Sequence, residues 1–247
     1  MAGNKTQKNG ITLLGLGPGA PESLTREAWE WLKNIDVLYL RTRHHPTVNF
    51  LPNKLTLISF DDIYEAHDSF EGVYGTIIEQ VISLGRSSEG VTYAVPGHPF
   101  VAEATFPELY QRAKGAGISV RVIDGLSFLE PTFRALGVDP FPDLVCADAM
   151  RIASAETPQF PPSSPALIAQ IYSRMVASDV KLTLMNIYPD DHPVRLIHGA
   201  GTEGELIEDL PLFEIDHSKH LGLLSSLFVP PLSLYKSFES FQEIIAK

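Results

Sequence analysis

A single histidine stands in a turn that two prolines and a glycine make rigid, Pro96-Gly97-His98-Pro99. The prolines fix φ, the glycine frees it, and the apolar run before the turn predicts a buried strand that ends there. A histidine in this setting has three possible roles: a hydrogen bond to a cofactor, proton transfer as a general base, or a bond to the backbone of its own turn. The residues around it leave all three open.

Two further turns that carry glycine follow strand-like runs. The sequence GLGPGAPESLT places Gly15, Gly17 and Gly19 between a predicted strand and a predicted helix, and DGLSF, residues 124–128, follows another strand candidate. Parallel strands end at one edge of a sheet, where ligands bind, so we expect the three turns to line one pocket of backbone and small side chains. Neither a dinucleotide fingerprint nor a P-loop fits, because Pro18 interrupts the glycines and no Gly-Lys-Ser/Thr follows.

Strands and helices alternate through the first half of the chain, which predicts a mostly parallel, doubly wound sheet with helices on both faces. Ser23 or Thr25 can cap the first helix, and Gly85 is a favoured residue just past the end of the second. Strand-like runs lie at residues 11–17, 36–40, 55–60, 90–97 and 118–125, and helical spacing lies at 21–35, 69–85 and 105–117.

The pattern changes after about Gly125. A short helix is expected at 126–137, an irregular stretch at 139–149 and a proline-rich surface loop at 157–165. Later β-branched or alternating runs predict a mixed, largely antiparallel sheet; they lie at 166–172, 180–188, 194–201, 204–215 and 225–232. The expected fold is therefore α/β with two lobes. Its parts are a disordered tail at 1–10, an N-terminal lobe at 11–123, a C-terminal mixed lobe at 124–235 and a tail at 236–247.

Composition excludes several classes of function. The formal net charge of −11 argues against nucleic acid or an anionic membrane as the main partner. Cys146 is the only cysteine, which excludes a disulfide framework and a cysteine-based zinc site. The polar N-terminus and the lack of an apolar run of about 18 residues indicate a protein of the reducing cytoplasm without a membrane segment. His44-His45 and the sequence YPDDHP, residues 188–193, are simpler as a solvated loop and a turn, so no metal is expected.

Four segments, in this order and spacing, resemble the tetrapyrrole (corrin/porphyrin) methylase family: GLGPG with LT after it, YAVPGHPFVAEAT, DGLSFLEPTF and VKLTLMNIYPDDHPV. They are most similar to the methylase-like N-terminal domain of YabN-type MazG fusion proteins, over about residues 11–235. The resemblance implies S-adenosylmethionine in a cleft between two α/β lobes and a homodimer. It also implies a fused or separate MazG-type pyrophosphohydrolase as a partner, with residues 236–247 as a tail or as the linker to it.

The resemblance also implies which residues contact the cofactor. His98 stands where most members have an acidic residue, a departure that bears on the tetrapyrrole substrate more than on the cofactor. Apolar residues within 221–235 are expected to form part of the dimer interface. The implied cofactor-binding residues are Pro18, Pro96, Gly97, His98, Val101, Ser127, Phe128, Gln170 and Gly201, with no catalytic residue assigned.

Methyl transfer from a sulfonium needs positioned reactants and exclusion of water rather than a metal or a covalent nucleophile. We therefore expect an S-adenosylmethionine-dependent methyltransferase whose small-molecule acceptor is unknown. Arg41, Arg43 and His44 are candidates for contact with an anionic acceptor. The alternative is a non-catalytic domain that senses the cofactor or a nucleotide and regulates a MazG-type nucleoside triphosphate pyrophosphohydrolase. The lack of an obvious acid or base in the motif loops favours that alternative.

Overall fold

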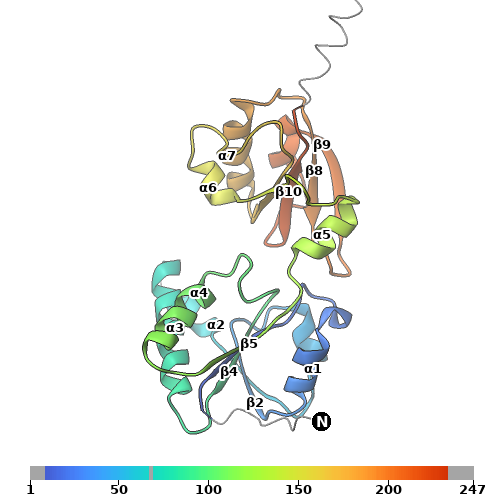
Figure 1. The fold of residues 1–247 in the computed structure, drawn as a ribbon. Helices are drawn as coiled ribbons and strands as arrows, with labels where there is room; N and C mark the ends of the chain where they lie inside the picture. The colour runs from blue at the N-terminus through green and yellow to red at the C-terminus, as the bar shows by residue number, and fades with distance from the viewer. Residues whose placement is uncertain (1–8, 67–68, 233–247) are drawn as a thin grey trace, which may run out of the picture. The chain divides into compact units, whose positions relative to one another are not determined.

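The computed structural model describes residues 9–66 and 69–232, and the chain divides into two compact units, Met1–Pro131 and Thr132–Lys247 (Figure 1). This division falls inside α5 (Leu129–Leu136), whereas the sequence had placed it at the end of the preceding strand, between residues 123 and 124. The predicted tail at 236–247 lies outside the described residues, as does most of the tail at 1–10. Gly10 is an exception, because its carbonyl accepts a hydrogen bond from Val91 N at 2.9 Å.

The first unit contains a parallel five-stranded sheet in the order β3-β2-β4-β1-β5, which confirms the predicted arrangement. The chain leaves β1 toward β2 on one side, and leaves β4 toward β5 on the other side of β1. These two connections therefore run in opposite directions from neighbouring strands. The strands are β1 (Ile11–Gly15), β2 (Val37–Leu40), β3 (Thr56–Ser59), β4 (Val91–Val95) and β5 (Val120–Ile123).

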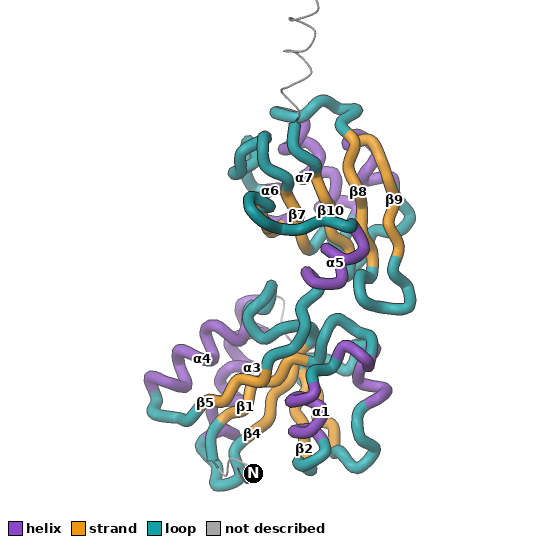
Figure 2. The backbone as a smooth tube through the Cα atoms, turned by 45° about the vertical axis from the view of Figure 1, so that its right-hand side comes forward, coloured by secondary structure: helices purple, strands orange, loops and turns teal. Residues whose placement is uncertain are grey.

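Helices cover both faces of this sheet, as Figures 1 and 2 show. One face packs against α1 through Ala28, Trp31 and Leu32, and the other packs against α3 and α4. The connections that leave β1 and β4 pass to opposite faces, so they diverge at the carboxyl ends of these strands, the place where open α/β sheets bind ligands. The helices are α1 (Arg26–Leu32), α2 (Asp61–Ala66), α3 (Phe70–Gly85) and α4 (Thr105–Gly115), with 3-10 turns η1 (Pro21–Ser23) and η2 (Pro46–Phe50).

Two local predictions in this unit need correction. The helix expected at 21–35 is split into η1 and α1, because Thr25 begins α1 by accepting a hydrogen bond from Ala28 N at 3.1 Å. Gly85 does not follow α3 but is its last residue. Its lack of a side chain has a packing reason, since an added Cβ would lie 2.9 Å from Ile11 Cδ1.

The second unit contains a mixed sheet in the order β6-β7-β10-β8-β9, with three antiparallel pairs and one parallel pair, as predicted. A single apolar cluster joins one face of this sheet to α6, α7 and η3 (Figure 1). The elements are β6 (Val145–Asp148), α6 (Ala149–Ala153), β7 (Ala166–Ala169), α7 (Arg174–Met185), β8 (Pro193–His198), β9 (Leu206–Pro211), η3 (Leu212–His217) and β10 (Ser225–Val229).

The structure overturns two predictions in this unit. The stretch 139–149, expected to be irregular, contains β6, which pairs in parallel with β7. The run 180–188, expected to join the sheet, belongs mainly to α7. Its apolar residues alternate like those of a strand, but the buried Val176, Val180 and Leu184 recur at helical spacing, and Ser173 caps the helix.

Candidate functional site

The three glycine turns lie together at one edge of the parallel sheet, as the sequence predicted. Gly97 N donates to the carbonyl oxygen of Gly17 at 2.7 Å, and Gly17 N donates to that of Gly97 at 3.2 Å. The turns after β1 and β4 are therefore paired to each other as well as to their strands.

The third turn, after β5, approaches the other two through glycine backbone. An added Cβ on Gly15 would lie 2.5 Å from the carbonyl oxygen of Gly97 and 2.6 Å from the nitrogen of Gly125. Real Cβ atoms do not approach backbone this closely, so these positions require glycine. The point of contact is also where the connections from β1 and β4 diverge, the place where open α/β sheets bind ligands.

His98 has a polar contact at each ring nitrogen, a hydrogen bond at Nδ1 and a longer contact with a carboxylate at Nε2. Phe100 N donates to Nδ1 at 3.0 Å, so the proton of the neutral ring is on Nε2, which lies 3.4 Å from Asp124 Oδ1. Of the roles left open by the sequence, the bond to the turn backbone is therefore present. A general base would need the lone pair on Nδ1 that the Phe100 amide already occupies.

Thr25 and Asp124 join the first and third turns. The Thr25 hydroxyl caps α1 and donates to the carbonyl oxygen of Asp124 at 3.0 Å. Because the Asp124 side chain also faces His98, this residue contacts both other loops. The threonine of the GLGPG…LT motif thus has a structural role in holding the site together.

Ser127 is buried and starts α5. Its backbone N–H and hydroxyl both donate to Glu130 Oε2, at 2.8 and 2.6 Å, and its oxygen accepts from Leu129 N at 3.0 Å. This reciprocal pattern is a capping box, S-x-x-E, and it fixes the backbone of the third turn.

The position beside Gly97 is open, and this distinguishes it from its glycine neighbours. Gly97 has φ of +70°, and an added Cβ would meet only Ser127 Cα, at 4.0 Å. The Cα of Gly97 therefore faces a cradle between the second and third turns that a side chain would fill. Pro18 is buried in the first turn, while Pro96, Val101 and Phe128 are half-buried.

The sequence failed to identify a buried ion pair next to the second turn. The Arg41 guanidinium pairs with the Glu103 carboxylate and donates from Nε to the Tyr64 hydroxyl at 3.1 Å. Burial alone would lower the pKa of Arg41, but Glu103 and then Tyr64 raise it above its ordinary value. The sequence had suggested that Arg41, Arg43 and His44 contact an anionic acceptor. In the structure the Arg41 guanidinium is instead paired with Glu103 and Tyr64 within the protein.

His45, next to the exposed His44, is 7% exposed, and its Nδ1 has no hydrogen-bond partner. Burial lowers the pKa of His45 to about 4. Two residues on, the Thr47 hydroxyl donates to the carbonyl oxygen of Gly19 at 3.0 Å, so this segment packs against the first glycine turn. Both histidines were expected to be solvated, but only His44 is exposed, and His45 is buried.

Comparison with known proteins adds the family. Residues 10–216 match the Tetrapyrrole (Corrin/Porphyrin) Methylases, which is most of the chain. The chain belongs to this family. The chain is 41% identical over 240 residues to "Uncharacterized protein YabN" of Bacillus subtilis (strain 168), a match that covers 95% of the chain and 48% of the relative. The chain thus spans about half the length of that relative.

Solved structures share the fold of this chain. One is a uroporphyrin-III-C-methyltransferase from Thermus thermophilus, with a TM-score of 0.69, 20% identity and coverage of 94% of this chain and 96% of that chain. Another is a uroporphyrin-III C-methyltransferase from the same organism complexed with S-adenosylhomocysteine, with a TM-score of 0.62, 16% identity and coverage of 90% and 97%. At these identities the likeness shows the fold.

Two of the sequence-predicted positions lie in the second unit. Gln170 follows β7 with φ of +67°, rare for a residue with a side chain, and Gly201 lies in the turn after β8. β7 and β8 both run antiparallel to β10 between them, so both positions lie at the same sheet edge. Gly201 N donates to Glu205 Oε2 at 2.9 Å, so that N–H is already satisfied.

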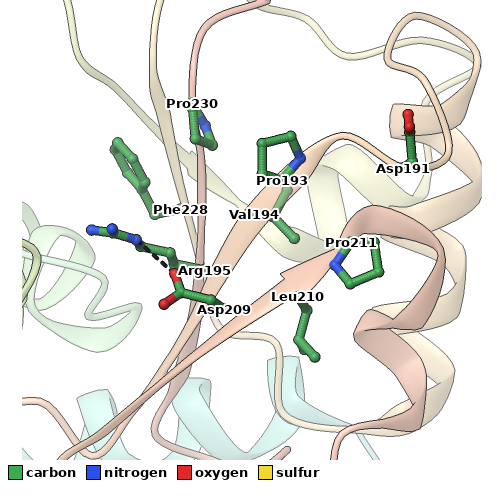
Figure 3. Close-up of a pocket in the computed structure, with 9 residues that line it drawn as sticks. All are labelled: Asp191, Pro193, Val194, Arg195, Asp209, Leu210, Pro211, Phe228 and Pro230. Atoms are coloured by element: carbon green, nitrogen blue, oxygen red, sulfur yellow. Dashed lines mark hydrogen bonds and ion pairs between the residues drawn. The ribbon is translucent and has the colours of Figure 1, made fainter.

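A separate shallow pocket of about 640 Å³ lies on the sheet of the second unit (Figure 3). Arg195 and Asp209 form an exposed ion pair of 2.9 Å within it, and prolines and Phe228 form its walls. It contains none of the sequence-predicted site residues. Its lining residues are Asp191, Pro193, Val194, Arg195, Asp209, Leu210, Pro211, Phe228 and Pro230.

The YPDDHP turn, the possible metal sites and the predicted dimer surface are the remaining sequence features. His192 of the YPDDHP turn bonds through Nε2 to the carbonyl oxygen of Pro230 at 3.0 Å. Within residues 9–66 and 69–232, no cluster of three or more His, Cys, Asp or Glu could hold a metal, and no helix is long and apolar enough to cross a membrane. The predicted dimer surface at 221–235 includes the exposed Leu223 and Leu224, and its last three residues lie outside the described part.

Proposed function

We propose that this protein binds S-adenosylmethionine at the three glycine turns of its first unit and transfers the methyl group to a small-molecule acceptor. The observation that supports this most strongly is the convergence of the turns after β1, β4 and β5 at the switch point of the sheet. Family membership and the neighbour complexed with S-adenosylhomocysteine support the same ligand class. The acceptor is left open.

The residues present fit such a cofactor. An added Cβ on Gly97 would meet only Ser127 Cα, so there is room for a ligand beside Gly97. The three turns carry no lysine or arginine, which suits an adenosyl group more than a phosphate. Pro18, Val101 and Phe128 would add apolar contacts around it. When bound, the cofactor supplies an activated methyl group on a sulfonium. The chain's part is to orient the reactants and exclude water, because this displacement requires no protein nucleophile.

His98 would act as a fixed wall of this site. With Nδ1 bonded to the Phe100 amide and Nε2 facing Asp124, the ring holds the Pro96–Pro99 turn against the third turn. An acceptor that is already nucleophilic at carbon would need no base from this loop.

One observation favours a second candidate, a sensor without catalytic activity. His98 is the titratable side chain of the second turn, its Nδ1 already accepts a hydrogen bond, and its Nε2 faces Asp124. A domain that only binds the cofactor or a nucleotide, and regulates a MazG-type pyrophosphohydrolase, needs no acid or base in these turns. The chain's spanning about half of its relative is compatible with a further domain in such proteins. Cytoplasmic location and a homodimer remain part of the proposal for either candidate.

Calorimetry with S-adenosylmethionine and S-adenosylhomocysteine tests the shared premise. We expect wild-type protein to bind both, and Gly97→Val to bind at least tenfold more weakly, because its side chain enters the cradle. Gly117→Val is the matched control, since Gly117 also has φ of +70° but faces open space. The two variants carry the same backbone strain.

Two outcomes would contradict the proposal: no binding of either compound by wild-type protein, or an equal loss of affinity in both variants. A labelled-methyl assay against cell extract then separates the two candidates. Transfer of label to a small molecule supports the methyltransferase, whereas binding without transfer supports the sensor.

A further inference from the structure

The loop that carries His98 and Val101 is anchored at both ends. At its start, Gly97 is paired with Gly17 by two backbone hydrogen bonds. At its end, Glu103 is 6% exposed, and its carboxylate accepts from Thr105 N at 3.0 Å and from the Thr105 hydroxyl at 2.5 Å. The same carboxylate pairs with the Arg41 guanidinium.

Arg41 connects this anchor to the sheet. It follows the last residue of β2, and its backbone N–H donates to the carbonyl oxygen of Ala94 in β4 at 2.9 Å. Its guanidinium then reaches Glu103, which lies eight residues beyond the end of β4. The Tyr64 hydroxyl accepts from Arg41 Nε, so the side chain is fixed from a second direction.

The backbone between the anchors is strained. Ala102, directly before Glu103, has φ of +52°, a conformation that costs an alanine free energy and persists only where neighbouring contacts impose it. The Arg41–Glu103 pair is such a contact, because it fixes the residue directly after Ala102. Its role is therefore to hold a loop shape that the loop's own sequence does not favour.

We propose that Arg41 and Glu103 are positioning residues for the cofactor, which act by holding His98 and Val101 in place and do not themselves contact the ligand. This inference rests on the proposed function, since it assigns the loop to the cofactor. It also explains why a buried ion pair is present at all. Well-packed neutral residues often give equal stability, whereas loss of one partner leaves an unpaired buried charge.

The second unit offers a matched control. Lys181 Nζ and Asp216 Oδ2 form a comparable pair of 2.6 Å between α7 and η3, with both side chains largely buried. This pair joins two core elements and anchors none of the predicted cofactor residues. A role in stability alone predicts that the two pairs respond alike to substitution.

The test compares single and double variants of both pairs by urea denaturation and by calorimetry with S-adenosylmethionine. We expect R41Q and E103Q each to lower the unfolding midpoint, and R41Q/E103Q to recover most of the loss because no unpaired charge is left. Affinity should nevertheless stay at least tenfold weaker in R41Q/E103Q, while K181Q/D216N binds as wild type does. Wild-type affinity in R41Q/E103Q, or an equal loss in K181Q/D216N, overturns the proposal.

Amide hydrogen exchange without cofactor separates this inference from the proposed function. The amides of Phe100 and Val101, bonded to His98 Nδ1 and to the His98 carbonyl oxygen, report the loop directly. We expect both to exchange at least tenfold faster in R41Q/E103Q and at the wild-type rate in K181Q/D216N. Unchanged exchange overturns the positioning role even if wild-type protein binds the cofactor. Faster exchange in a protein that binds no cofactor supports loop positioning and rejects the proposed function.

Discussion

The two sheets of this protein have the same number of strands but use their edges differently. In the parallel sheet, every strand ends at one edge, and the turns after β4, β1 and β5 are immediate neighbours there. In the mixed sheet, β10 runs the other way between β7 and β8, so the ends of β7 and β8 are separated by two strand spacings, about 10 Å. The turns after β7 and β8 are therefore not immediate neighbours, unlike the turns after β4, β1 and β5.

This difference shows why glycine matters in one unit and less in the other. Where three turns meet, backbone must pass backbone without side chains, as at Gly15 and Gly125. Where a strand separates the turns, glycine serves the shape of a single turn, as at Gly199 and Gly201 with φ of +60° and +79°. In the first unit, the backbones of three turns therefore form one continuous surface. In the second unit, Gln170 and Gly201 lie on turns that a strand separates.

The largest effect is expected from a methyl group at the meeting point. Gly15→Ala should lower the free energy of unfolding by roughly 4 kcal/mol or prevent folding, because the clash involves backbone that cannot move aside. Gly204→Ala is the matched change in the second unit, where the nearest atom is Thr202 Oγ1 at 3.7 Å, and it should change stability by less than about 0.5 kcal/mol. Urea denaturation measures both, and similar losses would contradict the comparison.

The next effect concerns pH and the first unit's buried histidine. Burial lowers the pKa of His45 from 6.5 to about 4, so the unfolded chain binds a proton between these values that the folded protein does not. The contribution of the neutral His45 to the free energy of unfolding is fully present above pH 6.5. It is lost as the pH falls toward 4, where the loss reaches about 3 kcal/mol.

Urea denaturation of His45→Gln between pH 7 and pH 4 measures that contribution. The variant should lose much less stability over this range than wild-type protein, whereas the exposed His44→Gln should follow wild type. If the unfolding free energy of His45→Gln depends on pH as that of wild-type protein does, the prediction is wrong. The folded protein would then bind a proton at His45 as readily as the unfolded chain does.

A smaller effect distinguishes two helix caps. Thr25→Val and Ser173→Ala each remove a side chain that accepts a hydrogen bond at the start of a helix, so each should cost about 1 kcal/mol of stability. Only Thr25 also bonds to the carbonyl oxygen of Asp124 in the third turn. Calorimetry should therefore show weaker binding of S-adenosylmethionine, about threefold or more, for Thr25→Val alone. Equal affinities would mean that this bond does not support the site.

The smallest effect is expected on the second sheet. Arg195 and Asp209 are an exposed pair in the shallow pocket, so Arg195→Gln should change the free energy of unfolding by less than about 0.5 kcal/mol. Cofactor affinity should be unchanged as well. A large loss of affinity would contradict the assignment of the cofactor to the glycine turns and would favour this pocket as the binding site.

The sequence predicted most of the first unit because its signals are local. Apolar strands followed by glycine turns identify the strand ends, and parallel pairing brings those ends to one edge. The Arg41–Glu103 pair escaped prediction because its members are 62 residues apart and Glu103 lies in a loop with no periodic pattern. The buried state of His45 was missed because a polar neighbour, His44, suggested a solvated segment.

The second unit was harder to predict because its patterns are ambiguous. Val180, Leu182 and Leu184 alternate as in a strand, yet Val180 and Leu184 also satisfy the spacing of a helix face, and only packing decides between the two. β6 has four residues, one of them Cys146 at an exposed edge position, too few to establish a pattern. Short elements of this kind are determined by the neighbours they pair with.

The position of β1 has a consequence for how the protein is made. β1 precedes the other strands of the parallel sheet in the sequence but lies inside that sheet, and its partners β4 and β5 begin at Val91 and Val120. Until both have been synthesised, the apolar ITLLG segment has two unpaired sides, and loop closure over such separations is slow. The three glycine turns therefore cannot come together before about residue 128 has been synthesised. Until then, β1 is an exposed apolar segment of the kind that chaperones bind.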